Sequence, residues 1–433
     1  MKPEKSIAFL ILFLAFSFVC AQPKIKPYTI ETTFQKLKKD YPFISPIQEL
    51  NSEKISSEEN VIYRKINGNE LKADVYYPEN SEEKLLPAVL LIHGGGWVSG
   101  SRENQKVMAQ HLAENGFVAV TASYRLSQEA KYPAAVLDLK AAVRWMREIS
   151  EKYKIDTAKI AVLGASAGAQ LATLVGVSPN SEKFKENNFK NSEEVQAIVN
   201  IDGIVSFIHP DAEEGEIAGL WLGGLQDENP ENWKAASPLE YVDENTPPTL
   251  FINSSQPRFH AGRDDMVEIL NKHTIYNEIH TIPDSPHSFW LMHPWFETTL
   301  NYTVDFLNKI FSENFQNRNK VYREVTVAKD GSGEFKNIQE AINSTLDLGP
   351  GEVVIHIKNG IYKEKIRIPS WKTKRNIKCE DRKKTVISNA HFSGKTNPET
   401  REAFCTSNTY TVLVQENDIK IENLTIENTS CRE

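Results

Sequence analysis

Between Val61 and about residue 312, strongly apolar segments alternate with segments of helical periodicity, and this alternation constrains the fold most. The apolar segments are short, as in "PAVLLIHGGGW", "FVAVTASYRL", "KIAVLGA", "VQAIVNI" and "PTLFINS". Between them, "ENQKVMAQHLAENG" and the segment from Pro133 to about Tyr153 carry apolar residues three and four positions apart. Continuously apolar strands separated by helices predict an α/β fold, a mostly parallel sheet with helices on both faces. "LKADVYYP" alternates like an edge strand.

Beyond Asn314 the pattern changes to short β-rich segments with no helices between them, such as "GEVVIHIKNGIYKEKIRI" and "YTVLVQENDIKIENLTIENTS". This spacing predicts the start of a parallel β-helix. A β-helix needs several stacked coils, so we expect a truncated one that ends at Glu433. The predicted order is a signal peptide (1–21), an extended lead-in (22–58), an α/β domain (59–314), a linker (315–323) and a partial β-helix (324–433).

The N-terminus has the pattern of a secretory signal peptide. Lysines precede an uncharged run from Ile7 to Val19, and a cleavage-like end precedes Gln22. We therefore predict a secreted or periplasmic protein without a membrane span. A lipid anchor on Cys20 is the alternative, which the bulky Val19 before it disfavours.

Composition limits the classes of partner. The net charge of −8 and the absence of a basic stripe with aromatics argue against nucleic-acid binding. The cysteines after the N-terminus are confined to positions 379, 405 and 431, without a histidine pattern for zinc. There is no H-E-x-x-H motif and no dinucleotide loop, so no metal or organic cofactor is predicted. The sequence does not indicate an oligomeric state.

The segment "KIAVLGASAGAQLA" places Ser166 between Gly164 and Gly168, where a predicted strand meets a predicted helix. Small neighbours suit either a plain tight turn or a strained turn that exposes a nucleophilic serine. Upstream, "HGGGW" ends another strand, and the backbone amides of Gly94, Gly95 and Ala167 would form an oxyanion hole. The glycine run favours the nucleophile.

The candidate base is His287 in "IPDSPHSFW", which follows the last apolar strand and lies C-terminal to the serine. His273, His280 and His293 are interpreted as surface or packing residues. The same interpretation applies to His260, although it lies in the loop after "TLFINSS".

Residues 61 to about 312 resemble α/β-hydrolase fold carbohydrate and carboxyl esterases of the acetylesterase and hormone-sensitive-lipase-like group. The resemblance rests on "HGGGW", "SYRL", "YPAAVLDLKAAVRWMRE", "GASAG", "ASPLEYV" before "PPTLFINS", and "PHSFW", in that order. It implies ester hydrolysis with Ser166 as nucleophile and His287 as base. It also implies that the backbone amides of Gly94, Gly95 and Ala167 form the oxyanion hole.

The acid of the triad departs from this resemblance. Such enzymes usually carry an aspartate a few residues after the strand before the histidine's strand, where this chain has Gln256. Glutamine can orient an imidazole but cannot stabilise its charge as a carboxylate does. Asp202, directly after "VQAIVNI", stands at a position that some lipases of this fold use. Asp264 or Asp265 is the alternative, but each is explained more simply as a helix N-cap. We predict Asp202.

From Val325 the chain resembles the start of a pectin methylesterase. "VAKDGSGEFKNIQEAIN", "GIYKEKIRI" and "NLTIENT" carry the resemblance, and the second contains a G-x-Y-x-E motif with Tyr362 and Glu364. The paired aspartates, glutamine-containing loop and arginine of that family have no counterpart in this segment. We therefore expect it to be catalytically inactive. Tyr362 and Trp371 are expected to be core or coil-capping residues.

The sequence thus predicts a secreted serine carbohydrate esterase that removes acyl groups, chiefly acetyl, from a plant polysaccharide such as pectin. The pectin assignment rests on the second segment. One alternative is a peptidase of the prolyl-oligopeptidase type, but this would need a substrate-gating domain that the sequence lacks. The other is a non-catalytic polysaccharide-binding module, which only Gln256 supports.

Overall fold

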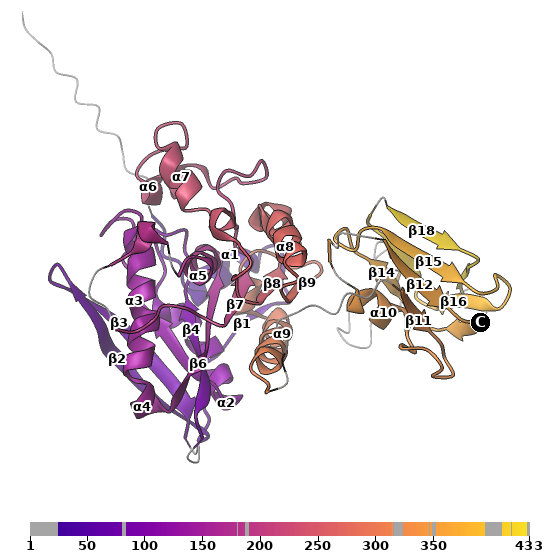
Figure 1. Cartoon of the computed structure of the whole chain (residues 1–433), viewed down its shortest axis with the longest axis horizontal. Helices are drawn as coiled ribbons and strands as arrows, with labels where there is room; N and C mark the ends of the chain where they lie inside the picture. Colours follow the sequence, from indigo (N-terminus) through magenta and orange to yellow (C-terminus); the bar gives the residue numbers. More distant parts are fainter. Residues whose placement is uncertain are drawn as a thin grey trace, which may run out of the picture.

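The computed structural model describes most of the chain as two bodies that follow one another along the sequence (Figure 1). The predicted signal peptide (1–21) with Cys20 lies outside the described residues, and Phe315 alone is described within the predicted linker (315–323). The described residues are 25–79, 84–179, 181–186, 190–313, 315, 324–345, 347–348, 352–394, 409–416 and 418–430.

The first body is built on an eight-stranded sheet with the order β2-β3-β5-β4-β6-β7-β8-β9. β3 is antiparallel to its neighbours β2 and β5, and every other pair is parallel. The predicted, mostly parallel sheet is confirmed. The strands are β2 (Ile55–Ile66), β3 (Asn69–Pro78), β4 (Leu86–Ile92), β5 (Val118–Ala122), β6 (Ile155–Ala165), β7 (Ala197–Ile201), β8 (Thr249–Asn253) and β9 (Asn277–Thr281).

β3 was expected at the edge of the sheet, and this prediction is wrong because β2 covers it. The two strands are joined at Asn67 and Gly68, whose φ angles of 49° and 83° are both positive. Two consecutive left-handed residues make the turn that closes a tight hairpin. β2 is largely polar and only partly buried, so its sequence lacks the apolar signal that marks the other strands.

Helices cover both faces of the sheet, as predicted, because alternate residues of a strand point to opposite sides. In β4, Leu90 and Ile92 belong to the core under α3, α5 and α8, whereas Val89 and Leu91 belong to the core under α2 and α9. Apart from those between β7 and β8, the helices of this body after β4 are η1 (Arg102–Gln105), α2 (Lys106–Glu114), α3 (Ala134–Glu148), α4 (Ser150–Tyr153), α5 (Ala167–Val177), η2 (Glu182–Phe184), η4 (Pro257–His260), α8 (Arg263–Lys272), η5 (Phe289–Leu291) and α9 (Trp295–Ile310).

The predicted extended lead-in (22–58) contains a helix, α1 (Ile30–Leu37), which corrects that prediction. The Thr29 side chain accepts a hydrogen bond from the Thr32 backbone amide at 3.1 Å and so caps the helix. Leu37 is buried in the core under α2 and α9. Prolines suggested an extended segment, but capping and an apolar face are enough to hold one short helix against the sheet. The short strands β1 (Ser45–Pro46) and β10 (Met292–His293) pair with each other.

Between β7 and β8 the chain leaves the sheet and forms α6 (Gly215–Leu222), α7 (Pro230–Ala235) and η3 (Pro238–Tyr241). The Trp221 ring of α6 stacks on Trp97, which follows the glycines after β4, with 5.3 Å between ring centroids. The segment between β7 and β8 therefore covers the end of the sheet at which the glycine loop lies.

The second body is a stack of parallel strands in three sheets, with the orders β11-β12-β15-β18, β13-β16-β19 and β14-β17. Successive coils are in register, because Ile355 pairs with Ile377, which pairs with Ile421. The predicted start of a parallel β-helix is confirmed. The elements are β11 (Glu324–Val327), α10 (Ile338–Ser344), β12 (Val353–Ile357), β13 (Gly360–Tyr362), β14 (Ile366–Ile368), β15 (Arg375–Cys379), β16 (Thr385–Asn389), β17 (Val412–Val414), β18 (Ile419–Glu422) and β19 (Thr425–Asn428).

The G-x-Y-x-E motif has structural roles in this second body. Tyr362 is buried in its core, as predicted, and donates its hydroxyl to the Lys358 carbonyl at 2.9 Å. The Glu364 carboxylate accepts the first two backbone amides of α10, both at 3.1 Å. The glutamate therefore caps a helix that closes one end of the core.

Glu364→Ala is expected to loosen α10 by about 1–2 kcal/mol, because two helix-terminal amides lose their acceptor. Hydrogen exchange of the α10 amides measures this loss, and exposed Glu324→Ala in β11 is the control. Unchanged α10 exchange would contradict the capping role.

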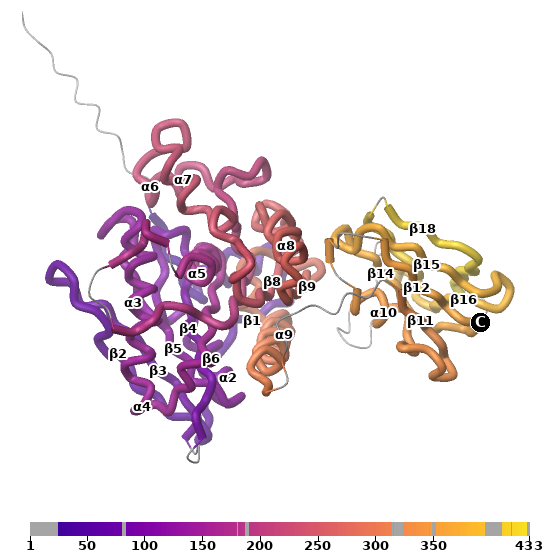
Figure 2. Tube along the Cα trace, viewed as in Figure 1, coloured from indigo at the N-terminus to yellow at the C-terminus, as the bar shows by residue number. Residues whose placement is uncertain are grey.

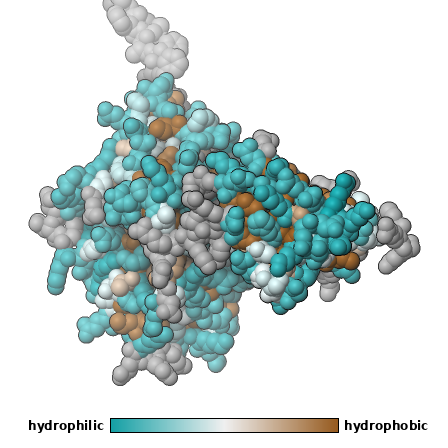
Figure 3. Space-filling model, turned by 45° about the vertical axis from the view of Figure 1, so that its right-hand side comes forward, coloured by the Kyte–Doolittle hydropathy of each residue, from teal (hydrophilic) through white to brown (hydrophobic). Residues whose placement is uncertain are grey.

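Figure 2 follows the chain from α9 into the second body, which begins at β11. The face of the molecule in Figure 3 carries mostly hydrophilic side chains. Within the described ranges, no helix combines the length and the apolar character needed to cross a bilayer.

Candidate active site

Ser166 stands at the sharp turn between β6 and α5. Its backbone has φ 57° and ψ −126°, a strained conformation of the kind that clusters at functional sites. A Cβ added at Gly164 would lie 2.0 Å from the carbonyl oxygen of Gly168, and one at Gly168 would lie 2.3 Å from that of Ile92. Only glycines fit at these two positions, and they let the serine stand at the carboxyl end of the sheet.

His287, in the loop after β9, joins Ser166 to Asp202. Its Nε2 is 2.8 Å from the Ser166 Oγ, and its Nδ1 is 2.6 Å from the Asp202 Oδ2. The fold therefore brings together three side chains whose sequence separations are 121 and 85 residues. A serine, a histidine and a buried aspartate in this order are the arrangement by which hydrolases activate a hydroxyl.

The carboxylate of Asp202 is completely buried and accepts three hydrogen bonds. Besides His287, the donors to Asp202 are the Ser254 backbone amide at 2.8 Å and the His260 Nε2 at 3.3 Å. Burial by itself would raise the pKa of Asp202, but hydrogen bonds from the two histidines outweigh it and hold this pKa well below its usual range. Asp202 is therefore a charged partner for His287.

The two other positions considered for the acid lie elsewhere. Gln256 is exposed, and its backbone amide donates to the Ser254 side chain at 3.2 Å. Asp264 accepts a hydrogen bond from the Arg263 Nε at 2.7 Å. The prediction that Asp264 or its neighbour caps α8 is wrong, because Gly262 holds the N-cap position and the aspartates lie within the first turn.

His260, interpreted from the sequence as a surface or packing residue, is a neighbour of Asp202. Phe259 beside it was missed altogether: its ring stacks on the His287 ring with 3.6 Å between centroids. Trp290 meets the same histidine edge-on at 5.1 Å. Two aromatic contacts thus hold the imidazole plane. The position of Phe259 and His260 in the loop after β8 was the signal that could have found them, because this fold usually carries its acid in that loop.

The glycine loop after β4 lies against the serine. A Cβ added at Gly94 would come 2.9 Å from the Ser166 Cβ. Gly95 has φ 120°, and its carbonyl accepts the backbone amide of Ser99 at 3.0 Å. Ala167 is the first residue of α5, where helix amides have no partner within the helix. Gly94 and Ala167 therefore lie next to Ser166, and Gly95 follows Gly94 in the same loop.

His93 holds this loop in place. Its Nδ1 lies 2.8 Å from the Gly94 carbonyl oxygen, and its ring stacks on Tyr124 at 4.4 Å. Burial lowers the pKa of His93 to about 4, so the ring is neutral at pH 7. In a trans peptide, the N–H of the next residue points opposite to the carbonyl. Anchoring the Gly94 carbonyl therefore fixes the direction of the Gly95 N–H.

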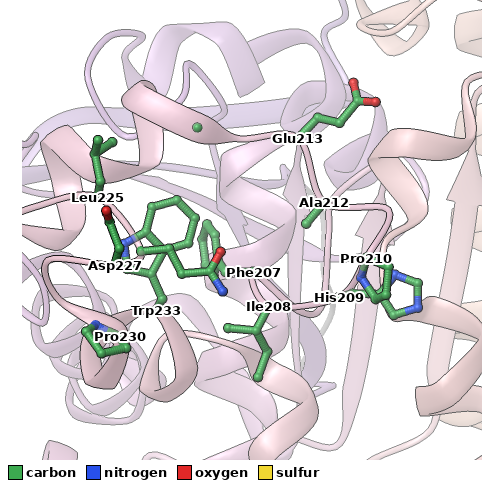
Figure 4. Close-up of a pocket in the computed structure, with 12 residues that line it drawn as sticks. Phe207, Ile208, His209, Pro210, Ala212, Glu213, Leu225, Asp227, Pro230 and Trp233 are labelled. Carbon is green, nitrogen blue, oxygen red and sulfur yellow. The ribbon is translucent and has the colours of Figure 1, made fainter.

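A cavity of about 830 Å³ opens in the segment between β7 and β8. Figure 4 shows the rings of Phe207 and Trp233 in its wall, with the carboxylates of Glu213 and Asp227. The wall therefore combines an apolar surface with negative charge. Its remaining residues are Ile208, His209, Pro210, Ala212, Gly215, Leu225, Gln226 and Pro230.

The cavity is connected to His287 through the side chain of Arg258. Arg258 pairs with Glu213 at 3.3 Å. Its guanidinium also lies 4.4 Å from the centroid of the Phe259 ring, which stacks on His287. Arg258 thus lies between Glu213 in the wall of the cavity and the Phe259 ring that stacks on His287.

Across the described part of the chain, no group of three or more His, Cys, Asp or Glu side chains is placed to hold a metal ion. The mostly parallel sheet, the strained serine after β6 and the histidine after β9 define the class as an α/β-hydrolase.

Comparison with known families and proteins agrees with this class. Residues 73–277 match the BD-FAE family and residues 324–433 match the Pectinesterase family. The chain is 30% identical over 190 residues to Esterase LipC of Mycobacterium tuberculosis (strain ATCC 25618 / H37Rv), covering 42% of this chain and 47% of LipC. It is 37% identical over 110 residues to Ethyl acetate hydrolase of Pseudomonas putida, covering 25% of this chain and 35% of that protein.

Among solved structures, the chain is similar to the bifunctional GH43-CE of Bacteroides eggerthii. The sequence identity is 26%, the TM-score is 0.52, and the match covers 59% of this chain and 38% of that one. The chain spans about half the length of the first curated relatives it matches, with 47% of LipC covered. The chain joins an α/β-hydrolase esterase domain to a pectinesterase-type domain.

Proposed function

We propose that the esterase domain is a serine carboxylic-ester hydrolase in which Ser166 is the nucleophile, His287 the general base and Asp202 the acid. The observation that carries this proposal is the hydrogen-bonded chain through the three side chains, at 2.8 Å and 2.6 Å. The strained serine backbone and the adjoining glycine loop are further support.

In the proposed reaction, the Ser166 Oγ attacks the ester carbonyl carbon while the His287 Nε2 takes its proton. The amides of Gly94, Gly95 and Ala167 stabilise the oxyanion. The alcohol leaves with the proton from His287, and an acyl group remains on the serine. Water attacks this acyl group while His287 takes a proton from the water. His287 then gives this proton to the departing Ser166 Oγ, which regenerates the serine and releases the carboxylic acid. Asp202 stabilises the imidazolium that forms in each half of the reaction.

For the substrate we propose an acetylated plant polysaccharide, with pectin as the first choice. The support is the pectinesterase-type domain on the same chain, together with the similarity to a protein named for ethyl acetate hydrolysis. Tethering two domains that meet one polymer raises the local concentration of each at that polymer. Export, which such a substrate needs, stays a prediction because residues 1–21 lie outside the described residues.

The substrate proposal predicts which products appear in one digest of highly acetylated, methylated pectin. Acetate is expected, because the esterase domain carries the complete Ser–His–Asp arrangement. Methanol is not expected, because the paired aspartates, glutamine-containing loop and arginine of pectin methylesterases have no counterpart in residues 324–433. Both products are quantified from the same reaction, with Ser166→Ala as the control.

Methanol release in this digest would contradict the predicted inactivity of the pectinesterase-type domain. Acetate released from acetylated xylan, with none from pectin, would contradict the choice of polymer and leave the chemistry intact. Loss of acetate release in Ser166→Ala separates the enzyme from a contaminant.

The alternatives lack comparable support. A non-catalytic binding module was considered because Gln256 stands where an acid is usual, but Asp202 is the residue hydrogen-bonded to His287. A peptidase of the prolyl-oligopeptidase type has no specific observation in its favour.

A further inference from the structure

The two domains touch each other at α8, on the side of the esterase domain that faces the second body in Figure 1. The Asn271 side chain of α8 donates a hydrogen bond to the carbonyl of Asp347. Leu348 and Trp371, from the pectinesterase-type domain, pack against the core under α3, α5 and α8. The Leu348 amide donates to the Trp371 carbonyl at 2.7 Å, which joins the two contact residues.

Trp371 therefore has a different role from the predicted core or coil-capping one, since it contacts the neighbouring domain. The Arg263 guanidinium lies 5.4 Å from the centroid of its ring, within the range of a cation–π contact. Arg263 is only 5% exposed, so the contact is shielded from water. Arg263 also donates a hydrogen bond to the Asn253 side chain at 2.9 Å and is paired with Asp264 at 2.6 Å.

Arg263 also faces the histidine that supports the acid. One of its terminal nitrogens lies 3.4 Å from the His260 Nδ1. A guanidinium only donates hydrogen bonds, so the Nδ1 must be the acceptor and the proton of the neutral ring must be on Nε2. That nitrogen lies 3.3 Å from the Asp202 Oδ1. Arg263 therefore selects the tautomer of His260 that donates to the acid.

We propose that His260 and Arg263 are positioning residues for Asp202, and that Trp371 holds Arg263 in place. By this route the pectinesterase-type domain supports the active site of the esterase domain. The inference rests on the proposed function only in taking Asp202 as the acid. It gives the second domain a role that requires no catalysis of its own.

The first test replaces the histidine. His260→Ala should lower kcat for a short acyl ester about tenfold, the upper range for residues that act through a network, and leave KM within about twofold. His260→Gln should restore most of the loss, because its amide can donate to Asp202. His293→Ala, whose histidine pairs with Glu297, is the control. A kcat equal to the control, or no rescue by glutamine, would overturn the role of His260.

The second test is a double-mutant cycle in the full chain. Trp371→Ala should lower kcat about threefold to fivefold, whereas in the Arg263→Met background it should cost nothing further, because coupled residues are not additive. Trp371→Phe, which keeps a ring face, should behave as wild type. Exposed Ile361→Ala in the same domain is the matched control.

Additive effects in this cycle, or a Trp371→Ala kcat equal to that of Ile361→Ala, would overturn the link between the domains. Thermal melts check that each variant is folded, and the neutral Arg263→Gln replaces Arg263→Met if the latter does not fold. Failure of the proposed function is distinguishable, because the wild-type chain would then hydrolyse no ester and Ser166→Ala would change nothing.

Discussion

Ser166→Ala is expected to lower kcat for a short acyl ester roughly 10⁶-fold, the scale of losing the nucleophile of a Ser–His–Asp hydrolase. Alanine removes the Oγ that lies 2.8 Å from the His287 Nε2 and leaves the backbone turn intact. A second readout is covalent labelling. An organophosphonate should add its mass to the peptide containing Ser166 in the wild type and to no peptide of the variant.

The matched control for this substitution lies on the same helix. Ser178 caps the other end of α5, and its hydroxyl donates to the Leu174 carbonyl. Ser178→Ala should retain wild-type kcat and labelling. Turnover of Ser166→Ala within tenfold of the wild type, in a folded protein, would refute the nucleophile assignment.

Asp202→Asn is expected to lower kcat about 10⁴-fold, because a neutral side chain neither stabilises the imidazolium nor fixes the correct tautomer of His287. Asp202 is completely buried and lies 2.6 Å from the His287 Nδ1. Asparagine preserves its size, so the fold should be retained. Steady-state kinetics with a short acyl ester, together with a thermal melt, measures the two effects separately.

Asp264→Asn is the comparison, since it changes the other candidate acid in the same way. Asp264 contacts Arg263, not His287, and its side chain is 55% exposed. We expect kcat within about threefold of wild type, as for a surface substitution. The opposite ranking of the two variants would transfer the role of the acid to the loop after β8.

The sequence was sufficient where the signal is local. The apolar strands, the helices between them and the glycines around Ser166 are each encoded within about ten residues, because periodicity and the steric demands of a turn act over that distance. The change to short β-strands rich in Ile and Val was likewise a local signal. The strand β2 was missed because it is largely polar. The helix α1 was missed because the prolines around it suggested an extended segment, although its eight residues carry an apolar face.

Local signals favoured Asp202 as the partner of the histidine but could not decide between it and Asp264. Gln256 showed only that the usual position carries no carboxylate, while Asp202 before it and Asp264 after it both stood in plausible places. The parallel pairing of β7 with β8 places Ile201 beside Ile252. It thereby brings Asp202 to the Ser254 amide at 2.8 Å.

By itself, the sequence determined the layered α/β architecture, the strained serine, its histidine and the change to a β-helix. Only the tertiary structure decided that Asp202 is the partner of His287, that His260 is its neighbour and that Trp371 contacts the esterase domain. The reason is that these contacts join residues from different strands and domains. Their distances depend on how the sheet is paired and how α8 meets the second body, which no single segment encodes.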